Sequence, residues 1–171
     1  MTHEERGWLG GLCRWSLVVG LTLFPARLHA QLLSAISLSF TSIPGSVPLG
    51  GAGTNSASVD FGNVSALQPL NGGVSRTVGA SSYTVSTDFG VRATKNSLGV
   101  LSPNYTLRAR LQSAQSLTWR VDGTTLTTTD AIIGTSQPYE TSVPHSLSFV
   151  VPFSYAAGTV NTVLEITAIA N

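Results

Sequence analysis

Leu117-Thr-Trp-Arg-Val121, Asp122-Gly123 and Thr124-Thr-Leu-Thr-Thr128 are the consecutive segments of this sequence that decide its fold. Two runs of alternating apolar and polar residues flank an Asp-Gly pair, which readily takes the positive φ angles of a type I′ turn. The twist of that turn matches paired antiparallel strands, so we expect a β-hairpin. In its register Trp119 lies opposite Leu126, and both side chains face inward as core anchors.

Further strand-like runs separated by turn residues extend along the rest of the chain. They are expected at 57–61, 74–78, 83–87, 90–93, 105–112, 146–151 and 163–169. Asp60-Phe61-Gly62 and Asp88-Phe89-Gly90 are interpreted as strand ends that lead into glycine turns. No stretch after residue 30 keeps a helical period over three turns. Short strands at this spacing predict an all-β sandwich or barrel.

The segment Ala35 to Ile43 alternates strictly from its second residue. Ile36, Leu38 and Phe40 fall on one face, and serine and threonine fall on the other, as in a half-buried strand. Pro44 and the glycines that follow then break the regular pattern. The segment is either the first strand of its own domain or a strand that is donated to a neighbouring molecule.

The N-terminus has the layout of a secretory signal peptide. Arg6 and Arg14 precede an apolar run from Trp15 to Phe24, and cleavage is expected after Ala30. The run is about half as long as a membrane-spanning helix needs. We therefore expect a signal peptide over 1–30, a single domain over 31–171 with no membrane anchor, and a secreted, periplasmic or cell-surface location.

The composition of residues 31–171 excludes some classes of protein. Basic and acidic residues are equal in number and scattered, so no cluster of cations is available to bind nucleic acid. The one cysteine, Cys13, lies in the expected signal peptide, so the domain has no disulfide to stabilise it. Packing and hydrogen bonding must hold the fold together.

The sequence offers no recognisable reaction centre. His145 is the one histidine after residue 30, and it is interpreted as a surface or turn residue because it follows Pro144. No His, Cys or carboxylate cluster has the spacing of a transition-metal or calcium site. Arg108 and Arg110 share one strand face, either as exposed polar residues or as a small anion or glycan contact. We expect no catalytic residues, cofactor or metal.

Three segments resemble bacterial pilin-type exported proteins, including spore-coat-U-like families. They are Val59-Asp-Phe-Gly-Asn-Val64, Pro152-Phe-Ser-Tyr-Ala-Ala-Gly158 and Val163-Leu-Glu-Ile-Thr-Ala-Ile169. The resemblance implies an immunoglobulin-like antiparallel β-sandwich that assembles or adheres outside the cell. In such families a partner strand completes an exposed sheet edge, and Ile36, Leu38 and Phe40 have the character of a partner strand.

Two main hypotheses of function follow. The first is a non-enzymatic structural or adhesive surface protein, such as a pilus-like or fimbrial subunit, that associates with itself or with other surface subunits. The second is an extracellular module that binds carbohydrate or another ligand, with Tyr83, Tyr105, Tyr139 or Trp119 as stacking platforms. A hydrolase is a third possibility that has only His145 and scattered acids to work with.

Overall fold

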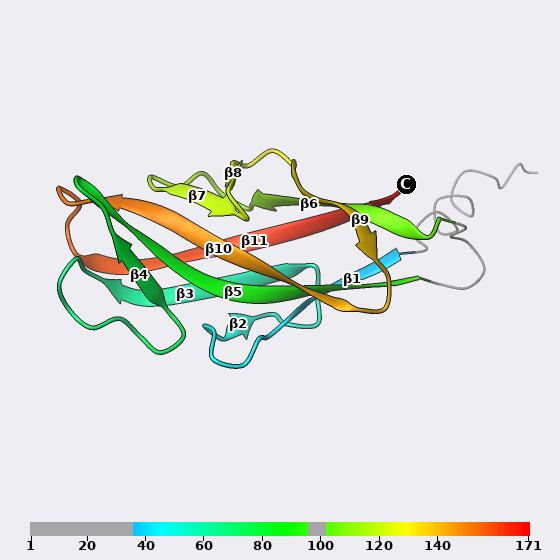
Figure 1. Cartoon of the computed structure of the whole chain (residues 1–171), viewed down its shortest axis with the longest axis horizontal. Helices are drawn as coiled ribbons and strands as arrows, with labels where there is room; N and C mark the ends of the chain where they lie inside the picture. Colours follow the sequence, from blue (N-terminus) through cyan, green and yellow to red (C-terminus); the bar gives the residue numbers. More distant parts are fainter. Residues whose placement is uncertain (1–35, 96–101) are drawn as a thin grey trace, which may run out of the picture.

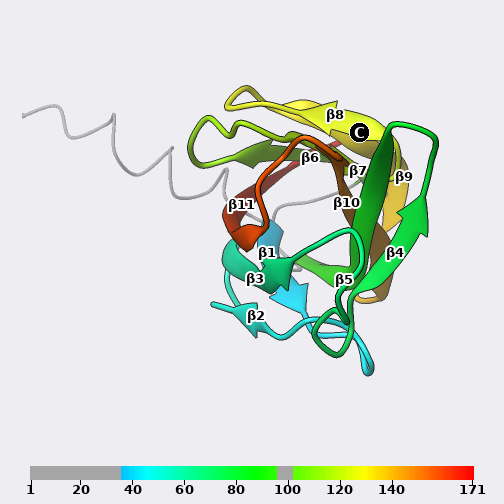
Figure 2. The same cartoon turned by 90° about the vertical axis from the view of Figure 1, so that its left-hand side faces the viewer.

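Eleven strands in two antiparallel sheets make up the structure of this chain, a computed structural model that describes residues 36–95 and 102–171. The expected signal peptide at 1–30 lies outside the described residues. Among those described, no helix has the length and apolar character needed to cross a membrane. The two sheets pack face to face (Figures 1 and 2), so the prediction of an all-β sandwich is confirmed.

Each sheet combines consecutive strands with strands that are distant in sequence. The six-stranded sheet has the order β1 (Ile36–Thr41), β5 (Ser82–Lys95), β10 (Ser142–Pro152), β7 (Thr118–Val121) and β8 (Thr124–Leu126), with β4 (Ser75–Val78) also paired to β5. The five-stranded sheet has the order β2 (Leu49–Gly50), β3 (Ser56–Val64), β11 (Gly158–Ala170), β6 (Asn104–Leu111) and β9 (Ala131–Pro138).

The order of the strands is that of a jelly roll. When β1, β2 and β4 are set aside, the other eight strands can be renumbered from 1 to 8 along the chain. In these numbers the five-stranded sheet has the order 1-8-3-6 and the six-stranded sheet has the order 2-7-4-5. In an immunoglobulin sandwich the last two strands are neighbours, whereas here β10 and β11 belong to different sheets. The strand order therefore supports a sandwich but does not show the immunoglobulin-like arrangement that the resemblance implies.

The Asp-Gly hairpin forms with the expected register. Asp122 and Gly123 have φ angles of 49° and 84°, as a type I′ turn requires. Trp119 pairs with Leu126, and both side chains lie in the core. Trp119 packs against Phe149 of β10 at 4.5 Å and against Phe61 of the opposite sheet at 5.7 Å between ring centroids. This aromatic cluster joins the two sheets at the centre of the sandwich.

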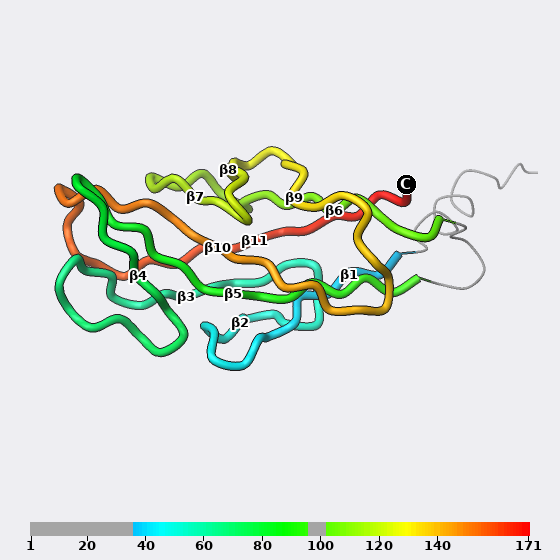
Figure 3. The backbone as a smooth tube through the Cα atoms, in the orientation of Figure 1, coloured from blue at the N-terminus to red at the C-terminus, as the bar shows by residue number. Residues whose placement is uncertain are grey.

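β5 is one continuous strand, which corrects the expectation of two short strands at 83–87 and 90–93. Asp88-Phe89-Gly90, which the sequence predicts as a strand end that leads into a glycine turn, lies in the middle of β5, and Phe89 points into the core. β5 and β10 pair along the length of the molecule, as the backbone trace shows (Figure 3). In Asp60-Phe61-Gly62 the glycine does take a positive φ, at an irregularity within β3 rather than at its end.

Replacing Trp119 by alanine should test the central packing. The side chain is 1% exposed, so Trp119→Ala removes apolar contacts from both sheets and should destabilise the fold by about 3–5 kcal/mol. Its neighbour Arg120 is exposed, so Arg120→Ala is the matched control and should change stability by less than about 0.5 kcal/mol. Urea unfolding of both variants measures the difference, and equal stabilities would contradict the assignment of Trp119 as a core anchor.

Candidate functional site

His145 is buried, so its interpretation as a surface or turn histidine is wrong. It occupies an inward-facing position of β10 and is 4% exposed. Its ring packs against Phe89 at 5.6 Å, and its Nδ1 lies 2.6 Å from Oδ2 of Asp122. The Nε2 atom is buried and has no hydrogen-bond partner among the described residues. A catalytic histidine would direct this second nitrogen at a nucleophile.

The pair of His145 and Asp122 holds the hairpin against β10. Oδ1 of Asp122 accepts a hydrogen bond from the backbone N–H of Ser146 at 2.8 Å, and the Asp122 N–H donates to the carbonyl of Ser146 at 3.0 Å. One turn residue therefore makes three hydrogen bonds to two consecutive residues of β10. The arrangement is a structural clamp, because both carboxylate oxygens are occupied by groups of the fold itself.

A charged cluster lies on the outer face of the five-stranded sheet. Arg110 contacts Glu165 at 2.6 Å and lies 3.9 Å from Asp130. The hydrogen bond from Arg110, followed by one from Gln112, holds the pKa of Glu165 below its ordinary value of 4.5. The Arg110 charge is thus already compensated. Any anion contact of the Arg108–Arg110 pair would rest on Arg108, whose Nε has no partner among the described residues.

None of the four aromatic residues considered as stacking platforms is available on the surface. Tyr83, Tyr105, Tyr139 and Trp119 are all buried, and burial, followed by the nearby Tyr139, raises the pKa of Tyr105. The loop between β10 and β11 carries two aromatic side chains that are exposed instead, Phe153 at 45% and Tyr155 at 38%. The sequence indicates their exposure in one way: the alternating pattern ends at Pro152, the last residue of β10, so Phe153 and Tyr155 fall in a loop.

The segment considered as a partner strand is paired within its own chain. β1 lies antiparallel to β5, with Ile36 and Leu38 partly buried and Phe40 fully buried against Phe89. The backbone N–H of Phe40 also donates to Thr54 at 2.8 Å, and its carbonyl accepts from Gly53 at 2.9 Å. Both backbone edges of this strand are therefore occupied at Phe40.

The outer face of the six-stranded sheet is rich in short hydroxyl side chains, and we call it the hydroxyl face. Its members lie at outward-facing positions of four strands: Ser37, Ser39, Thr41, Ser75, Thr77, Thr84, Ser86, Thr94, Ser142, Ser146 and Ser148. Several are paired across strands. The hydroxyls of Thr41 and Ser142 meet at 2.6 Å over Gly90, where a side chain would collide with both.

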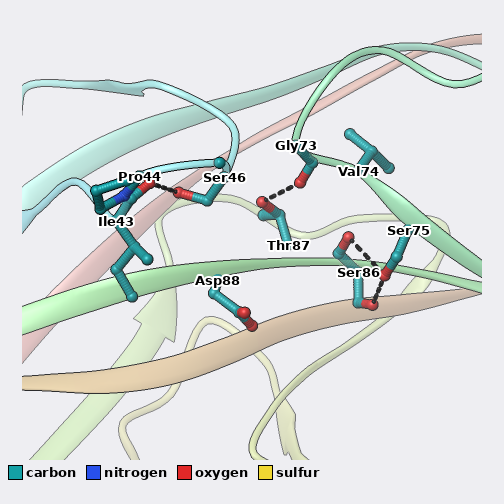
Figure 4. Close-up of a pocket in the computed structure, with 10 residues that line it drawn as sticks. Ile43, Pro44, Ser46, Gly73, Val74, Ser75, Ser86, Thr87 and Asp88 are labelled. Carbon is teal, nitrogen blue, oxygen red and sulfur yellow. Dashed lines mark hydrogen bonds between the residues drawn. The ribbon is translucent and has the colours of Figure 1, made fainter.

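A cleft of about 310 Å³ opens at the edge of this face (Figure 4). β1 and β4 share one edge of β5, but their pairing stops at Gly90 and Ser86 and leaves a gap between them. Thr87 closes the inner side of the gap, because its hydroxyl accepts from the N–H of Val47 at 2.9 Å and donates to the carbonyl of Gly73 at 2.8 Å. The cleft is lined by Ile43, Pro44, Gly45, Ser46, Gly73, Val74, Ser75, Ser86, Thr87 and Asp88.

Comparisons with known proteins do not assign this site. No protein-family model matches the chain, and no curated protein is detectably similar to it. Within 36–95 and 102–171 no group of three or more His, Cys, Asp or Glu side chains could hold a metal ion. The functional argument therefore rests on the hydroxyl face, the cleft and the edges of the sheets.

Replacing the carboxylate of the clamp should weaken the fold. Asparagine tolerates the left-handed φ of residue 122, so Asp122→Asn preserves the turn while removing one of the two acceptor oxygens. We expect a loss of about 1–3 kcal/mol in urea unfolding because either His145 or Ser146 loses its partner. Asp130→Asn, at an exposed residue, is the control and should cost less than about 1 kcal/mol. An Asp122→Asn variant as stable as the parent would contradict the clamp.

The ion pair of Glu165 predicts a pH dependence. Because the folded state lowers the pKa of this carboxyl, its contribution is present above pH 4.5 and is lost as the pH falls through the lowered pKa. Glu165→Gln should therefore destabilise the protein at pH 7 by less than about 1 kcal/mol, and the difference should vanish in acid. Glu140→Gln, which removes a longer and more exposed pair, is the control and should have a smaller effect. Thermal unfolding at several pH values measures both; a Glu165→Gln effect independent of pH would contradict the assignment.

Proposed function

We propose that this chain is an exported structural or adhesive surface protein that acts through the faces and edges of its sandwich. The support is the secretory layout of its first thirty residues, the two-sheet fold and the resemblance to pilin-type proteins. The proposal concerns an exported sandwich in general and does not require an immunoglobulin order of strands. Among the described residues, His145 and most of the carboxylates make contacts within the fold, and surface contact is the activity that the geometry favours.

The hydroxyl face is the observation that carries this proposal. Serine and threonine lose little side-chain entropy on contact, and each hydroxyl can both donate and accept a hydrogen bond. Rows of hydroxyls can meet another subunit or a polar polymer at a smaller desolvation cost than rows of charges, and charged residues such as Asp88, Arg92 and Arg120 are a minority on this face. The long antiparallel pair of β5 and β10 presents these residues in regular rows.

Assembly by strand exchange is the form of this proposal that we favour. β2 and β8 are short, and the pairing of β9 is irregular at two places, so these edges are poor templates for another strand. β1 is different, because it is regular, amphipathic and attached by the segment at 42–48. A β1 strand contributed by a neighbouring molecule would reproduce the same register on β5 and the same burial of Ile36, Leu38 and Phe40.

A cysteine pair across β1 and β5 tests the exchange directly. Ser39 lies opposite Arg92, so Ser39→Cys with Arg92→Cys should form a disulfide across these strands. With no other cysteine after residue 30, exchange predicts a ladder of covalent multimers on a non-reducing gel of oxidised, concentrated protein. Either single variant is the control and should give dimers at most. A disulfide confined to monomers would contradict the exchange.

The wider proposal has its own test. Cells that produce the chain should display it to external protease, and cells that lack it should attach less well or assemble an altered surface. If the purified domain stays strictly monomeric and such cells keep a normal surface and normal attachment, the structural or adhesive role is wrong. The ligand-binding module then becomes the better hypothesis, because the cleft beside the hydroxyl face would remain available.

A further inference from the structure

Asp88 is the one carboxylate of the described residues that the fold leaves without a partner. Asp60 accepts the N–H of Gly62, Asp122 holds His145, Asp130 accepts from Thr167, and Glu140 and Glu165 pair with arginines. Asp88 has neither an ion pair nor a side-chain hydrogen bond, and it lies at the edge of the cleft. Its neighbours across β10 and along β5 are serines and a glycine.

The backbone of Asp88 also faces the gap. Asp88 lies opposite Ser146, whose own N–H and carbonyl are bonded to Asp122 on the far side of β10. In an antiparallel pair, two opposite residues either exchange backbone hydrogen bonds with each other or direct their N–H and C=O groups away from each other. The N–H and the carbonyl of Asp88 therefore point away from β10 and toward the gap between β1 and β4. One residue thus contributes a carboxylate, a backbone donor and a backbone acceptor.

Two serine hydroxyls extend this polar surface. The Oγ atoms of Ser75 and Ser86 lie 2.7 Å apart at one wall of the cleft, where β4 begins (Figure 4). The Ser75 hydroxyl also donates to the carbonyl of Ser86 at 3.4 Å, so the bond between the two hydroxyls takes the hydrogen of Ser86, and the pair offers further acceptor capacity. The turn at 43–46 forms the opposite wall, with the hydroxyl of Ser46 turned inward to the carbonyl of Ile43 at 2.6 Å.

The geometry points to a neutral ligand that carries several hydroxyl groups, of the sugar type, and we infer that the cleft binds such a ligand. Acceptors outnumber donors, and a carboxylate with two free oxygens accepts strong hydrogen bonds from two neighbouring hydroxyls. The volume of about 310 Å³ is near the lower limit of ligand sites, which suits one or two sugar rings. This inference rests on the proposed adhesive function and names the chemistry of what is bound.

An extended peptide fits the cleft less well. Only the four steps of β5 between Ser86 and Gly90 separate the two flanking strands, which is about 14 Å of strand. Between Ser86 and Gly90, Asp88 is the only residue whose N–H and C=O groups point into the gap. A strand added there would therefore gain only one pair of hydrogen bonds. A peptide that docks on a sheet edge normally gains a longer ladder.

Titration of the ¹⁵N-labelled domain with neutral sugars tests the inference. The probes are methyl glycosides of glucose, galactose and mannose together with cellobiose and lactose. At least one should shift the amide resonances of Ser75, Ser86 and Asp88 and leave those of the distant Thr118 unchanged. Asp88→Asn should weaken that binding at least tenfold, because the charged acceptor is lost, while the melting temperature stays the same.

Two further variants test whether the position of a lost hydroxyl group matters for binding. Ser75→Ala should weaken binding, and Thr118→Ala, on the same face but away from the cleft, should not. If none of the probes shifts the cleft resonances up to its solubility limit, the inference is overturned. It is also overturned if Ca²⁺ or an extended threonine-rich peptide shifts them and the sugars do not. If cells with Asp88→Asn still attach to surfaces, attachment does not depend on this cleft, and the adhesive function stands without it. If the protein binds sugar but cells that lack it attach normally, the adhesive function is wrong and the sugar site stands.

Discussion

The contact of Phe61 with Trp119 and Phe149 is the interaction on which the rest of this structure depends. The three rings come from three strands and from both sheets, and each pair lies within 6 Å of one another. The domain has no disulfide, so this cluster and the alternating apolar residues around it must hold the sheets together. The type I′ turn at 122–123 sets the register that turns Trp119 inward, and a slip of one residue would turn it toward solvent.

Three polar residues of the described chain are buried, Thr87, His145 and Thr162, and the first two each bind a segment outside their own strand. Thr87 joins the segments around Val47 and Gly73 beneath the cleft, and His145 joins the hairpin to β10 through Asp122. A buried polar group is costly unless it is hydrogen-bonded, so each of these residues fixes the position of its partners. The floor of the cleft and the position of the hairpin are thus determined from inside the core.

Local chemistry is sufficient to predict the hairpin, the inward position of Trp119 and an all-β fold of sandwich or barrel type, because a turn and a period of two depend on consecutive residues alone. The strand order was not predictable in this way, since the jelly roll depends on pairings such as β3 with β11 that join distant segments. The sequence predicts a turn at Gly90, whereas the structure needs a glycine there inside β5, because the hydroxyls of Thr41 and Ser142 meet directly above it. β9 was missed because Gly134, a positive φ at Ser136 and two irregularities hide its alternation. The site at Asp88 was invisible for the same reason, because its walls come from segments that only the fold brings together.

The gap in the edge of β5 explains how one residue can both protect the sheet and offer a site. An unpaired edge invites the addition of another strand, and a charged side chain at the edge discourages it. Asp88 places such a charge where β1 and β4 leave the backbone bare, so a strand added there would have to accommodate an unpaired carboxylate. A hydroxyl-bearing ligand meets no such obstacle, because it can supply the donors that the carboxylate lacks. The carboxylate that opposes edge-to-edge pairing at the gap is therefore the same group that favours a sugar-type ligand.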